Sequence, residues 1–588
     1  MKGRVGMHSA KEHDIPLHFS RSTTSTRANK TGLWRYVEPF YEEKTAPCSA
    51  ACPAGEDIPR IEMLIARGRQ QEALSCIFEE NPFPAICGHV CFHPCETACN
   101  RGFFDDPVAI HHLERYLGYS ALQEEISAFA RPQPSNGRRV GIVGAGPAGL
   151  AAAYFFKRLG YDCDVYEAES SPGGVLRYGI PTYRLPEDVV EKETARISNL
   201  GVRFFFNRKI EQDFLNAACG DYHALVVAGG LSHAVQLNIP GENSAQKGLD
   251  LLRMLRTGRR PDLKGSAAVI GGGNTAVDVA RTLIRLGVES HIVYRRRKID
   301  MPAFNAEVRA AEAEGVRIAE LVSPIAMEKD GQDILLTVQK MRLQKPSTPE
   351  SRARVTASNS RPQTLRVQYV ITAVGSEPDV CWVPAPRQDA ELMRLDHCTL
   401  TFNGLPIVYS GDLVNRVQSV PDAVASGKAA AMAVDTYFNE GWDWIENRLS
   451  KCRIGGGPAL SMAAYAGSGE RRIHSQTVMY RDLNSDYFSA AARTETATAA
   501  VHERIDCFDA VLTNLSSVEA GREAERCFNC GRCNDCGNCE LFCPDAAVRV
   551  NAGRKTINLD YCKGCGVCVV ECPRNVMSLK EAHHEADS

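Results

Sequence analysis

The pattern of apolar and polar positions changes along this chain, and the changes predict its elements. Apolar residues follow a helical spacing in the first part, as in residues 58–77 and 110–129. A short apolar run at 140–143 then leads through a glycine-rich turn into a helical stretch, which predicts a strand, a turn and a helix. A second unit of this kind begins at Ala267. We therefore expect a small helical domain followed by two α/β units.

Polar and turn-rich stretches lie between these parts. Residues 1–33 lack periodicity and are expected to form an N-terminal arm, and residues 131–137 are expected to form a linker. The polar stretch 344–363 is expected to be a hairpin loop inside the second α/β unit. The Gly- and Ala-rich stretch 455–469 is typical of a tether to a C-terminal part.

The length and the charge limit the classes of protein to be considered. At roughly 150 residues per domain, 588 residues suggest about four domains. The chain is 44% hydrophobic and 24% charged, and no stretch approaches the ~18 apolar residues of a membrane span. A net charge of -3 gives no general attraction to nucleic acid or anionic lipid. The N-terminus lacks the apolar segment of a signal peptide, so we expect a cytoplasmic protein.

The 23 cysteines are clustered, with seven between Cys48 and Cys99 and ten between Cys527 and Cys572. A disulfide scaffold would not gather its cysteines in this way, and a cytoplasmic protein keeps its thiols reduced. The two groups therefore indicate metal binding, with iron and sulfide as the expected metal centre.

The C-terminal group contains the pattern Cys-x2-Cys-x2-Cys-x3-Cys-Pro twice, with the same spacing each time. Its members are Cys533, Cys536, Cys539 and Cys543, followed by Cys562, Cys565, Cys568 and Cys572. The two runs resemble those of bacterial two-cluster ferredoxins. The resemblance implies two [4Fe–4S] clusters that exchange their fourth ligands, so that Cys572 completes the first and Cys543 the second. A four-cysteine zinc site would use a longer spacer between two pairs. Cys527 and Cys530 exceed the ligands needed, and we expect them to be unligated or to close a turn.

The first α/β unit carries the glycine fingerprint of a dinucleotide site. Gly144 allows the tight turn after the strand, Gly146 lets backbone N–H groups approach a pyrophosphate, and Gly149 permits close packing of helix on strand. Glu167 ends the next strand, where a carboxylate accepts hydrogen bonds from a ribose. Strand, helix and acid all fall where the fingerprint requires them, and a purely structural turn is the alternative.

The second unit has the related form of this turn, with Gly271, Gly273 and Ala276. Its next strand ends in arginines, among them Arg295 and Arg296, where an NAD site would carry an acid. Arginine pairs with the 2′-phosphate of NADP, so the sequence favours NADPH over NADH. A solvated basic rim, or an arginine stacked on adenine, is the alternative.

The order of these parts resembles the small (β) subunit of bacterial glutamate synthase and its relatives over residues 34–440. Shared segments are PGGVLRYGIPTYRLP, YRRRKIDMPA and GDLVNRVQSVPDAVASGKAAA. The resemblance implies FAD in the first unit, with Asp412 near its ribityl or phosphate part, and a pyridine nucleotide in the second. The other positions that the fingerprints and the resemblance assign to cofactor binding are Pro147, Ala148, Gly174, Arg177, Arg184, Asn274, Thr275, Gly375 and Gly411.

The N-terminal cysteines depart from this family. Its members carry four cysteines in an early run, of which only Cys48 and Cys52 are present here. The resemblance implies that one [4Fe–4S] cluster is held by Cys52, Cys91, Cys95 and Glu114. Cys48 and Cys99 would belong to a second cluster whose other two ligands are missing. We therefore expect three clusters in the whole chain and leave a fourth open.

The later run of this group spaces its cysteines by four residues, from Cys87 to Cys99. Such spacing fits one helix face, but Gly88 and Pro94 interrupt it, so a loop around a cluster is expected.

These features together predict an oxidoreductase that transfers a hydride from NAD(P)H to FAD and single electrons through [4Fe–4S] clusters. No side chain is needed as acid or base, so no catalytic residue is named. The body with its ferredoxin-like tail resembles the iron–sulfur flavoprotein that serves dissimilatory sulfite reductase in sulfur metabolism. That reductase and a ferredoxin-like carrier are the candidate protein partners, and a homo-oligomer is left open.

Three alternatives remain at this point. A glutamate synthase subunit would need an amidotransferase partner and would not explain the tail. An enzyme of the dihydropyrimidine dehydrogenase type would need a further barrel domain, for which no residues remain. A non-enzymatic zinc scaffold would be colourless, whereas an iron–sulfur flavoprotein is brown-yellow.

The predicted fold class is multidomain α/β with two Rossmann-like domains, the second inserted in the first. The expected domains are an arm (1–33), a helical iron–sulfur domain (34–130), an FAD domain (138–262 and 373–445), an NAD(P) domain (263–372), a linker with helices (446–517) and a ferredoxin domain (518–588).

Overall fold

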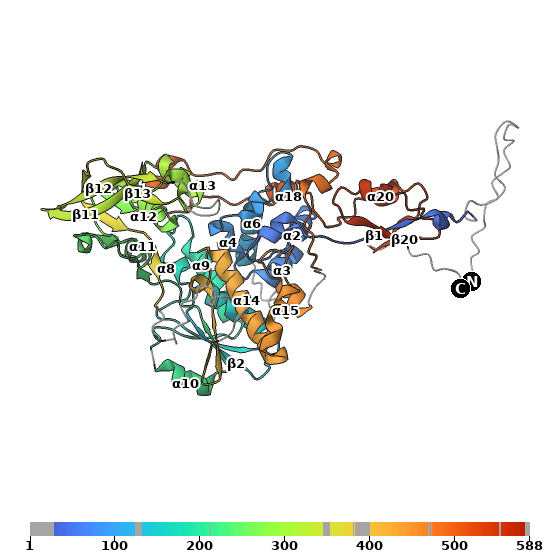
Figure 1. Cartoon of the computed structure of the whole chain (residues 1–588), viewed down its shortest axis with the longest axis horizontal. Helices are drawn as coiled ribbons and strands as arrows, with labels where there is room; N and C mark the ends of the chain where they lie inside the picture. Colours follow the sequence, from blue (N-terminus) through green and yellow to red (C-terminus); the bar gives the residue numbers. More distant parts are fainter. Residues whose placement is uncertain are drawn as a thin grey trace. The chain divides into compact units, whose positions relative to one another are not determined.

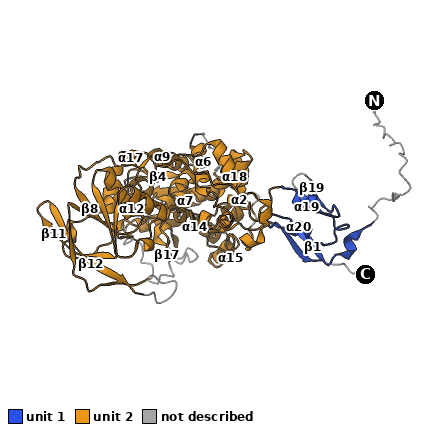
Figure 2. Ribbon diagram, turned by 90° about the horizontal axis from the view of Figure 1, so that it is seen from above, with its two compact units in different colours: residues 1–42, 535–588 blue, residues 43–534 orange. Residues whose placement is uncertain are grey.

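The computed structural model describes residues 29–123, 132–211, 213–344, 353–379, 382, 400–467, 471, 473–551 and 554–582. The chain divides into two compact units, one of Glu43–Asn534 and one of Met1–Glu42 with Asp535–Ser588 (Figure 2). Most of the predicted N-terminal arm lies outside the described residues. No described helix has both the length and the apolar composition that a membrane crossing requires.

The larger unit begins with a group of short helices. They are α1 (Pro47–Ala51), α2 (Ile58–Ala66), α3 (Gln70–Glu80), α4 (Pro84–Val90), α5 (Pro94–Thr97) and α6 (Ile110–Gln123). Helices α4 and α6 cross closely at two glycines, where a Cβ on Gly88 would lie 2.5 Å from Arg115 and one on Gly118 would lie 2.4 Å from Ala85. This crossing brings the end of α4 next to the first turns of α6.

The later cysteine run is divided between these helices. Cys87 lies on α4, Cys91 directly follows α4, and Cys95 lies on α5. Between the helices His93 has a left-handed backbone with a φ of 55°. The predicted interruption is present, but the loop is short because Pro94 starts a new helix.

The first α/β unit forms a six-stranded sheet in the order β17-β18-β5-β2-β3-β4. The strands are β2 (Arg139–Val143), β3 (Asp162–Tyr166), β4 (Arg203–Phe205), β5 (Ala224–Val227), β17 (Leu400–Phe402) and β18 (Leu405–Tyr409). All neighbours are parallel except β17 with β18. α7 (Pro147–Arg158) and α14 (Val420–Glu440, orange in Figure 1) pack on this sheet and on each other. The remaining helices of this part are α8 (Val175–Tyr178), α9 (Glu187–Ser198) and α10 (Phe214–Asp221).

The second α/β unit forms a parallel five-stranded sheet in the order β10-β9-β8-β15-β7. Its elements are β7 (Gln246–Lys247), α11 (Gly248–Arg256), β8 (Ser266–Ile270), α12 (Asn274–Arg285), β9 (Glu289–Tyr294), α13 (Asn305–Ala313), β10 (Arg317–Glu320) and β15 (Tyr369–Thr372). The short strands β6 (His233–Ala234) and β16 (Ser376–Glu377) pair where the chain enters and leaves this unit. The predicted multidomain α/β fold with two dinucleotide-type sheets is confirmed.

An antiparallel sheet extends the second unit. It consists of β11 (Val322–Asp330), β12 (Asp333–Leu343), β13 (Val355–Ala357) and β14 (Gln363–Val367). β12 pairs with β13, so the predicted hairpin in 344–363 has its two arms in this sheet, and residues 345–352 lie outside the described part.

Residues 455–467 of the Gly- and Ala-rich stretch do not form the free tether that its composition predicted, and residues 468–469 lie outside the described part. α15 (Ile445–Ser450) precedes this stretch, α16 (Met462–Ala466) lies within it, and Ile454 and Met462 are buried. The Ser461 hydroxyl donates to Glu80 Oε1 on α3, and small side chains permit this close packing. After α17 (Val501–Ile505), α18 (Ser517–Glu525) packs against α2 and α6 of the helical domain.

The smaller unit is built from both ends of the chain. β1 (Val37–Tyr41) pairs antiparallel with β21 (Met577–Glu581). β19 (Val548–Asn551) pairs with β20 (Arg554–Ile557), and the short helices α19 (Asn538–Leu541) and α20 (Val567–Val570) pack against each other.

Candidate functional site

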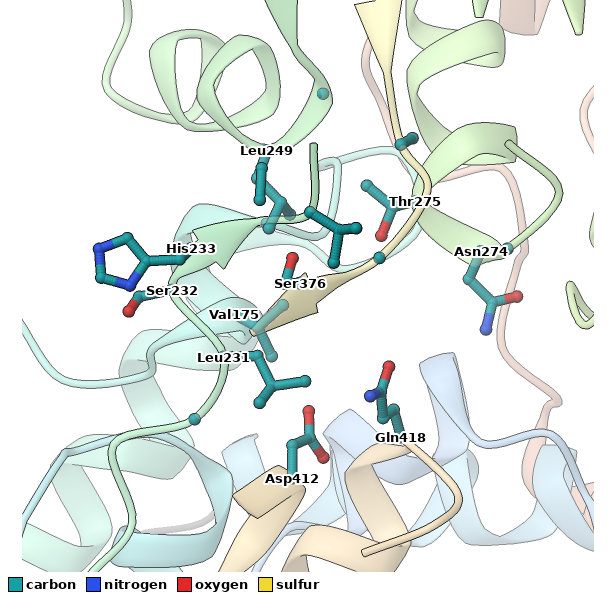
Figure 3. Close-up of a pocket in the computed structure, with 18 of the residues that line it drawn as sticks. Val175, Leu231, Ser232, His233, Leu249, Asn274, Thr275, Ser376, Asp412 and Gln418 are labelled. Carbon is teal, nitrogen blue, oxygen red and sulfur yellow. The ribbon is translucent and has the colours of Figure 1, made fainter. Parts of the chain in front are cut away.

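A cavity of about 1070 Å³ lies between the two α/β units. It is lined by the carboxyl ends of strands from both sheets, where nucleotides bind in open α/β folds. Figure 3 shows Asp412 and Gln418 projecting into this pocket from one side and Asn274 and Thr275 lying on the other. Both glycine-rich turns therefore face one shared space.

The first turn is held by contacts that only glycine permits. Gly144 has a φ of 104°, and a Cβ there would lie 2.3 Å from the Ala228 carbonyl oxygen. Gly146 faces the cavity with open space where its Cβ would be. Glu167 Oε2 accepts a hydrogen bond from Ala145 N at 2.7 Å, which ties the acid to the turn. A carboxylate has about four acceptor sites, so Glu167 keeps capacity for a ribose.

The second turn repeats this arrangement. Gly271 has a φ of 144°, and its Cβ would lie 2.2 Å from the Ala373 carbonyl oxygen, whereas Gly273 borders open space in the cavity. Asn274 Oδ1 accepts from Phe304 N at 3.0 Å, so this side chain fixes the adjoining loop. Both turns therefore leave the second glycine open for a ligand.

The arginines after β9 have different surroundings. Arg295 and Arg296 line the cavity, and Arg296 Nε is buried with no hydrogen-bond partner among the described residues. Arg297 is turned to Asp300, to which its Nε and Nη2 donate at 2.8 and 2.9 Å. Arg296 is thus the best placed of the three to bind an anion in the cavity.

Asp412 lies in the short turn before α14 and reaches the cavity. Burial, with a smaller effect of Asp422, raises the pKa of Asp412 to about 6. Ser419 caps α14 by accepting from Asp422 N at 3.2 Å, so the start of this helix also faces the cavity.

The other predicted cofactor residues fall into two groups. Pro147, Ala148, Gly174, Arg184, Gly375 and Gly411 line the cavity with those above, whereas Gly149 and Ala276 pack inside the turns and Arg177 lies away from the cavity. Arg177 Nε donates to the Pro172 carbonyl at 3.0 Å. Arg184 is held by Asp278, to whose carboxylate oxygens its Nη1 donates at 2.9 and 2.8 Å.

The N-terminal candidates Cys52, Cys91, Cys95 and Glu114 lie together in the helical domain. Burial, with the neighbouring charges of Glu114 and Cys52, holds the pKa of the Cys91 thiol well above its usual range. Burial, with Cys91 and Cys52, has the same effect on Cys95. The His93 N–H donates to Cys91 Sγ at 3.3 Å. Val90 lines the cavity, so Cys91 follows directly after a residue of the cavity wall.

Two residues that sequence reasoning did not select lie beside Glu114. Asn81 Nδ2 donates to Glu114 Oε1 at 3.0 Å and to Glu56 Oε1 at 2.8 Å, so a second buried carboxyl shares this place. Burial and Glu56 raise the pKa of Glu114 well above its usual range. Cys87 is also close, since Glu114 and Cys91 both contribute to its raised pKa. For Cys87, the signal available in the sequence was the four-residue spacing of the cysteine run that it begins.

Cys48 and Cys99 are not isolated in this domain. Burial is the main cause of the raised pKa of Cys48, and the next largest are the charges of Cys99, Cys527 and Cys530. Cys527 and Cys530, which the ferredoxin pattern does not need, are therefore neighbours of Cys48 and Cys99, whose expected cluster lacks two ligands in the N-terminal sequence.

In the smaller unit, Cys543 lies beside Cys562, Cys565 and Cys568. Burial, with the charges of Cys562, Cys543 and Cys565, raises the pKa of Cys568 to about 12. The Ala547 N–H donates to Cys543 Sγ at 3.2 Å, and the Val576 N–H donates to Cys572 Sγ at 3.4 Å. Within the described residues, no three His, Cys, Asp or Glu side chains are close enough to hold a single metal ion.

Comparison with known proteins agrees with this division of the chain. Residues 138–427 match the model of the pyridine nucleotide-disulphide oxidoreductases, residues 41–126 that of dihydropyrimidine dehydrogenase domain II with a 4Fe-4S cluster, and residues 555–578 that of a 4Fe-4S binding domain.

Two of the matching relatives are subunits of redox enzymes. The β subunit of an NADP(+)-dependent formate dehydrogenase from Moorella thermoacetica is 31% identical over 83% of this chain and 71% of its own length. The β subunit of an NADPH-Fe(3+) oxidoreductase from Geobacter sulfurreducens is 35% identical over 59% of this chain, which spans about half (53%) of that relative. Among solved structures, FprA from Mycobacterium tuberculosis has a TM-score of 0.43 at 18% identity, over 57% of this chain and 89% of its own.

Proposed function

This chain belongs to the family of FAD- and NAD(P)-dependent iron–sulfur oxidoreductases, and we propose that it exchanges electrons between NADPH and a protein redox partner. FAD, when bound, accepts a hydride from the nicotinamide and releases single electrons to [4Fe–4S] clusters. The residues of this chain bind and orient these groups, and no side chain is assigned as an acid or base.

The observation that carries the proposal is the shared cavity between the two glycine-rich turns. Gly146 and Gly273 both border open space there, so a pyrophosphate can approach the backbone at each turn. Asp412 and Glu167 supply acceptors on the side of the first sheet. The residues around the two turns would hold FAD and a pyridine nucleotide in one shared cavity, and hydride transfer between such groups requires that both are bound close together.

The choice of NADPH rests on Arg296, with Arg295 in support. A buried guanidinium nitrogen without a partner is costly unless a ligand completes it, and a 2′-phosphate would do so. The names of both relatives above refer to NADP or NADPH, which also supports this choice.

The cluster that receives electrons from the cavity is proposed to be held by Cys52, Cys91, Cys95 and Glu114. Val90 lines the cavity and Cys91 directly follows it in the chain, which supports a cluster beside the cavity. Cys87 is the competing fourth ligand because it lies beside Glu114 and Cys91. Variants Glu114→Ala and Cys87→Ser, compared by EPR of the reduced full chain, separate these two ligand sets.

The ferredoxin-like clusters are proposed to deliver the electrons. Cys543 lies with Cys562, Cys565 and Cys568, which supports one cluster with an exchanged fourth ligand. The other is then assigned to Cys533, Cys536, Cys539 and Cys572.

The partner is proposed to be dissimilatory sulfite reductase or a ferredoxin-like carrier, in either direction of electron flow. The glutamate-synthase-like body with a ferredoxin-like tail supports the first. A further candidate partner is the catalytic subunit of a dehydrogenase, which the match to a formate dehydrogenase subunit over 83% of the chain supports. A glutamate synthase role would need an amidotransferase partner and leaves the tail without use.

The test is NADPH oxidation by the purified full chain with each candidate acceptor under anaerobic conditions. NADPH should bleach the flavin and cluster absorbance, and one acceptor should be reduced at a rate that depends on its concentration. A holoprotein that oxidises neither NADPH nor NADH would refute the proposed function.

A further inference from the structure

The segment after α18 enters the helical N-terminal domain and is held there by hydrogen bonds and an ion pair. Arg101 Nη1 donates to the Arg526 carbonyl at 2.7 Å. Asn529 Nδ2 donates to the Pro59 carbonyl at 2.9 Å. Arg532 Nη1 lies 3.1 Å from Asp57 Oδ2. Residues 526–532 are therefore a fixed part of this domain, although they follow it by some four hundred positions.

This insertion brings four cysteines together. Cys48 and Cys530 are buried in one apolar core, against which Cys99 and Cys527 also pack. No described cysteine forms a disulfide. The four thiols come from separate elements: Cys48 lies on α1, Cys99 precedes a short helical turn, and the other two lie in the loop after α18.

N–H groups point at the sulfur atoms of the added pair. The Asn529 backbone N–H donates to Cys527 Sγ at 3.4 Å, two residues on, as the His93 N–H does to Cys91 Sγ at 3.3 Å. Asn100 Nδ2 donates to Cys530 Sγ at 3.4 Å. Donors to sulfur stabilise a thiolate more than a thiol, and hydrogen bonds to ligand sulfurs are a usual feature of iron–sulfur sites.

A buried polar atom without a partner faces the same region. Glu62 on α2 is 1% exposed, and its Oε2 has no hydrogen-bond partner among the described residues. Glu62 is a charge neighbour of both Cys48 and Cys527. Beside two buried and two half-buried thiols, an unsatisfied buried carboxyl is costly unless a bound group accounts for it.

We propose that Cys48, Cys99, Cys527 and Cys530 ligate a further [4Fe–4S] cluster, with two ligands from each end of the chain. This metal site goes beyond the proposed function, because the proposal does not depend on which partner or which nucleotide the protein uses. It supplies the two ligands that the N-terminal sequence lacks, and it assigns a role to the two cysteines that exceed the ferredoxin pattern.

The chain connects this site directly to the next one. Cys530 is three residues from Cys533, and three residues span at most about 11 Å. Cys530 and Cys533 belong to the same compact unit, so a cluster held by Cys530 lies close to the first cysteine of the ferredoxin-like run. Cys95 has Cys48 among its charge neighbours, so the same cluster also adjoins the one proposed next to the cavity.

The test compares full-length variants Cys48→Ser and Cys527→Ser with wild type after anaerobic purification. Wild type should contain about 16 iron atoms, at four per cluster, and each variant about 12. Both variants should lose the same EPR signal and keep FAD. The matched control is Cys507→Ser, a half-buried cysteine in the preceding segment whose thiol donates to the Glu503 carbonyl, and it should keep all the iron.

Two results would overturn the proposal. One is an unchanged iron content in Cys527→Ser, and the other is the loss of different EPR signals by the two variants. If a variant does not fold, the wild-type protein still decides the question, because Mössbauer quantification of about 12 rather than 16 iron atoms per chain excludes the fourth cluster. None of these readouts depends on NADPH oxidation, so failure here is distinct from failure of the proposed function.

Discussion

Replacement of Arg296 by alanine should weaken NADPH binding much more than NADH binding. Arg296 lines the cavity, is partly buried, and has an Nε without a partner, so its charge is available to a 2′-phosphate. A hydrogen bond to a charged group contributes about 1.5–3 kcal/mol, which corresponds to a change of roughly 10- to 150-fold. We expect the KM for NADPH to rise by that factor in Arg296→Ala.

The neighbouring arginines provide controls within the same turn. Arg295 is exposed, and exposed ion pairs contribute about 0–1 kcal/mol, so Arg295→Ala should raise the KM for NADPH by no more than about fivefold. Arg297 is bound to Asp300, and Arg297→Ala should leave nucleotide preference unchanged.

The assay is the steady-state reduction of a dye by each nucleotide, with kcat/KM measured for all three variants. The KM for NADH should stay near that of wild type in Arg296→Ala, because NADH has no 2′-phosphate. Equal losses with NADPH and NADH would show that Arg296 serves only as a basic rim. The same conclusion would follow if Arg297→Ala raised the KM for NADPH as much as Arg296→Ala does.

Three further predictions concern other parts of the chain. Cys543→Ser should alter the EPR signal of the cluster assigned to Cys562, Cys565 and Cys568; an effect confined to the other ferredoxin-like cluster would contradict the exchange of fourth ligands. Arg184→Ala should lower the free energy of unfolding in urea by about 3–5 kcal/mol, because the buried partner carboxylate loses its cation; a loss below 1 kcal/mol would contradict this. Burial raises the pKa of Asp412 to about 6, above its unfolded value, so the folded FAD-free chain binds this proton more tightly and its stability falls as pH rises from about 4 to 6. Asp412→Asn should show a smaller fall over that range, and an identical pH profile would argue against a buried acid.

Features that depend on local sequence could be predicted well. Gly144 and Gly271 mark turns whose backbone conformation only glycine adopts easily, so the position of each turn is encoded within a few residues. The apolar runs before these turns are buried strands, because a strand of a parallel sheet that is covered on both faces is apolar along its length.

Features that depend on contacts between distant segments could not be predicted. Composition suggested a tether at 455–469, but small residues also allow close packing, and Met462 is buried in the core. The spacing of Cys527 and Cys530 indicates a pair of ligands, yet it carries no information about where the rest of the site lies.

The pairing of β1 with β21 has a consequence for synthesis of the protein. β1 leaves the ribosome before the whole larger unit is translated, and its hydrogen-bonding partner β21 follows only after that unit. During that interval β1 has an open edge, which is a site for aggregation, and the small sheet joins residues that are far apart in the sequence, so its contact order is high. The larger unit, whose first domains emerge in order, has time to fold meanwhile. We therefore expect ribosome-bound or C-terminally truncated chains to contain a folded nucleotide-binding body and an unfolded ferredoxin-like unit.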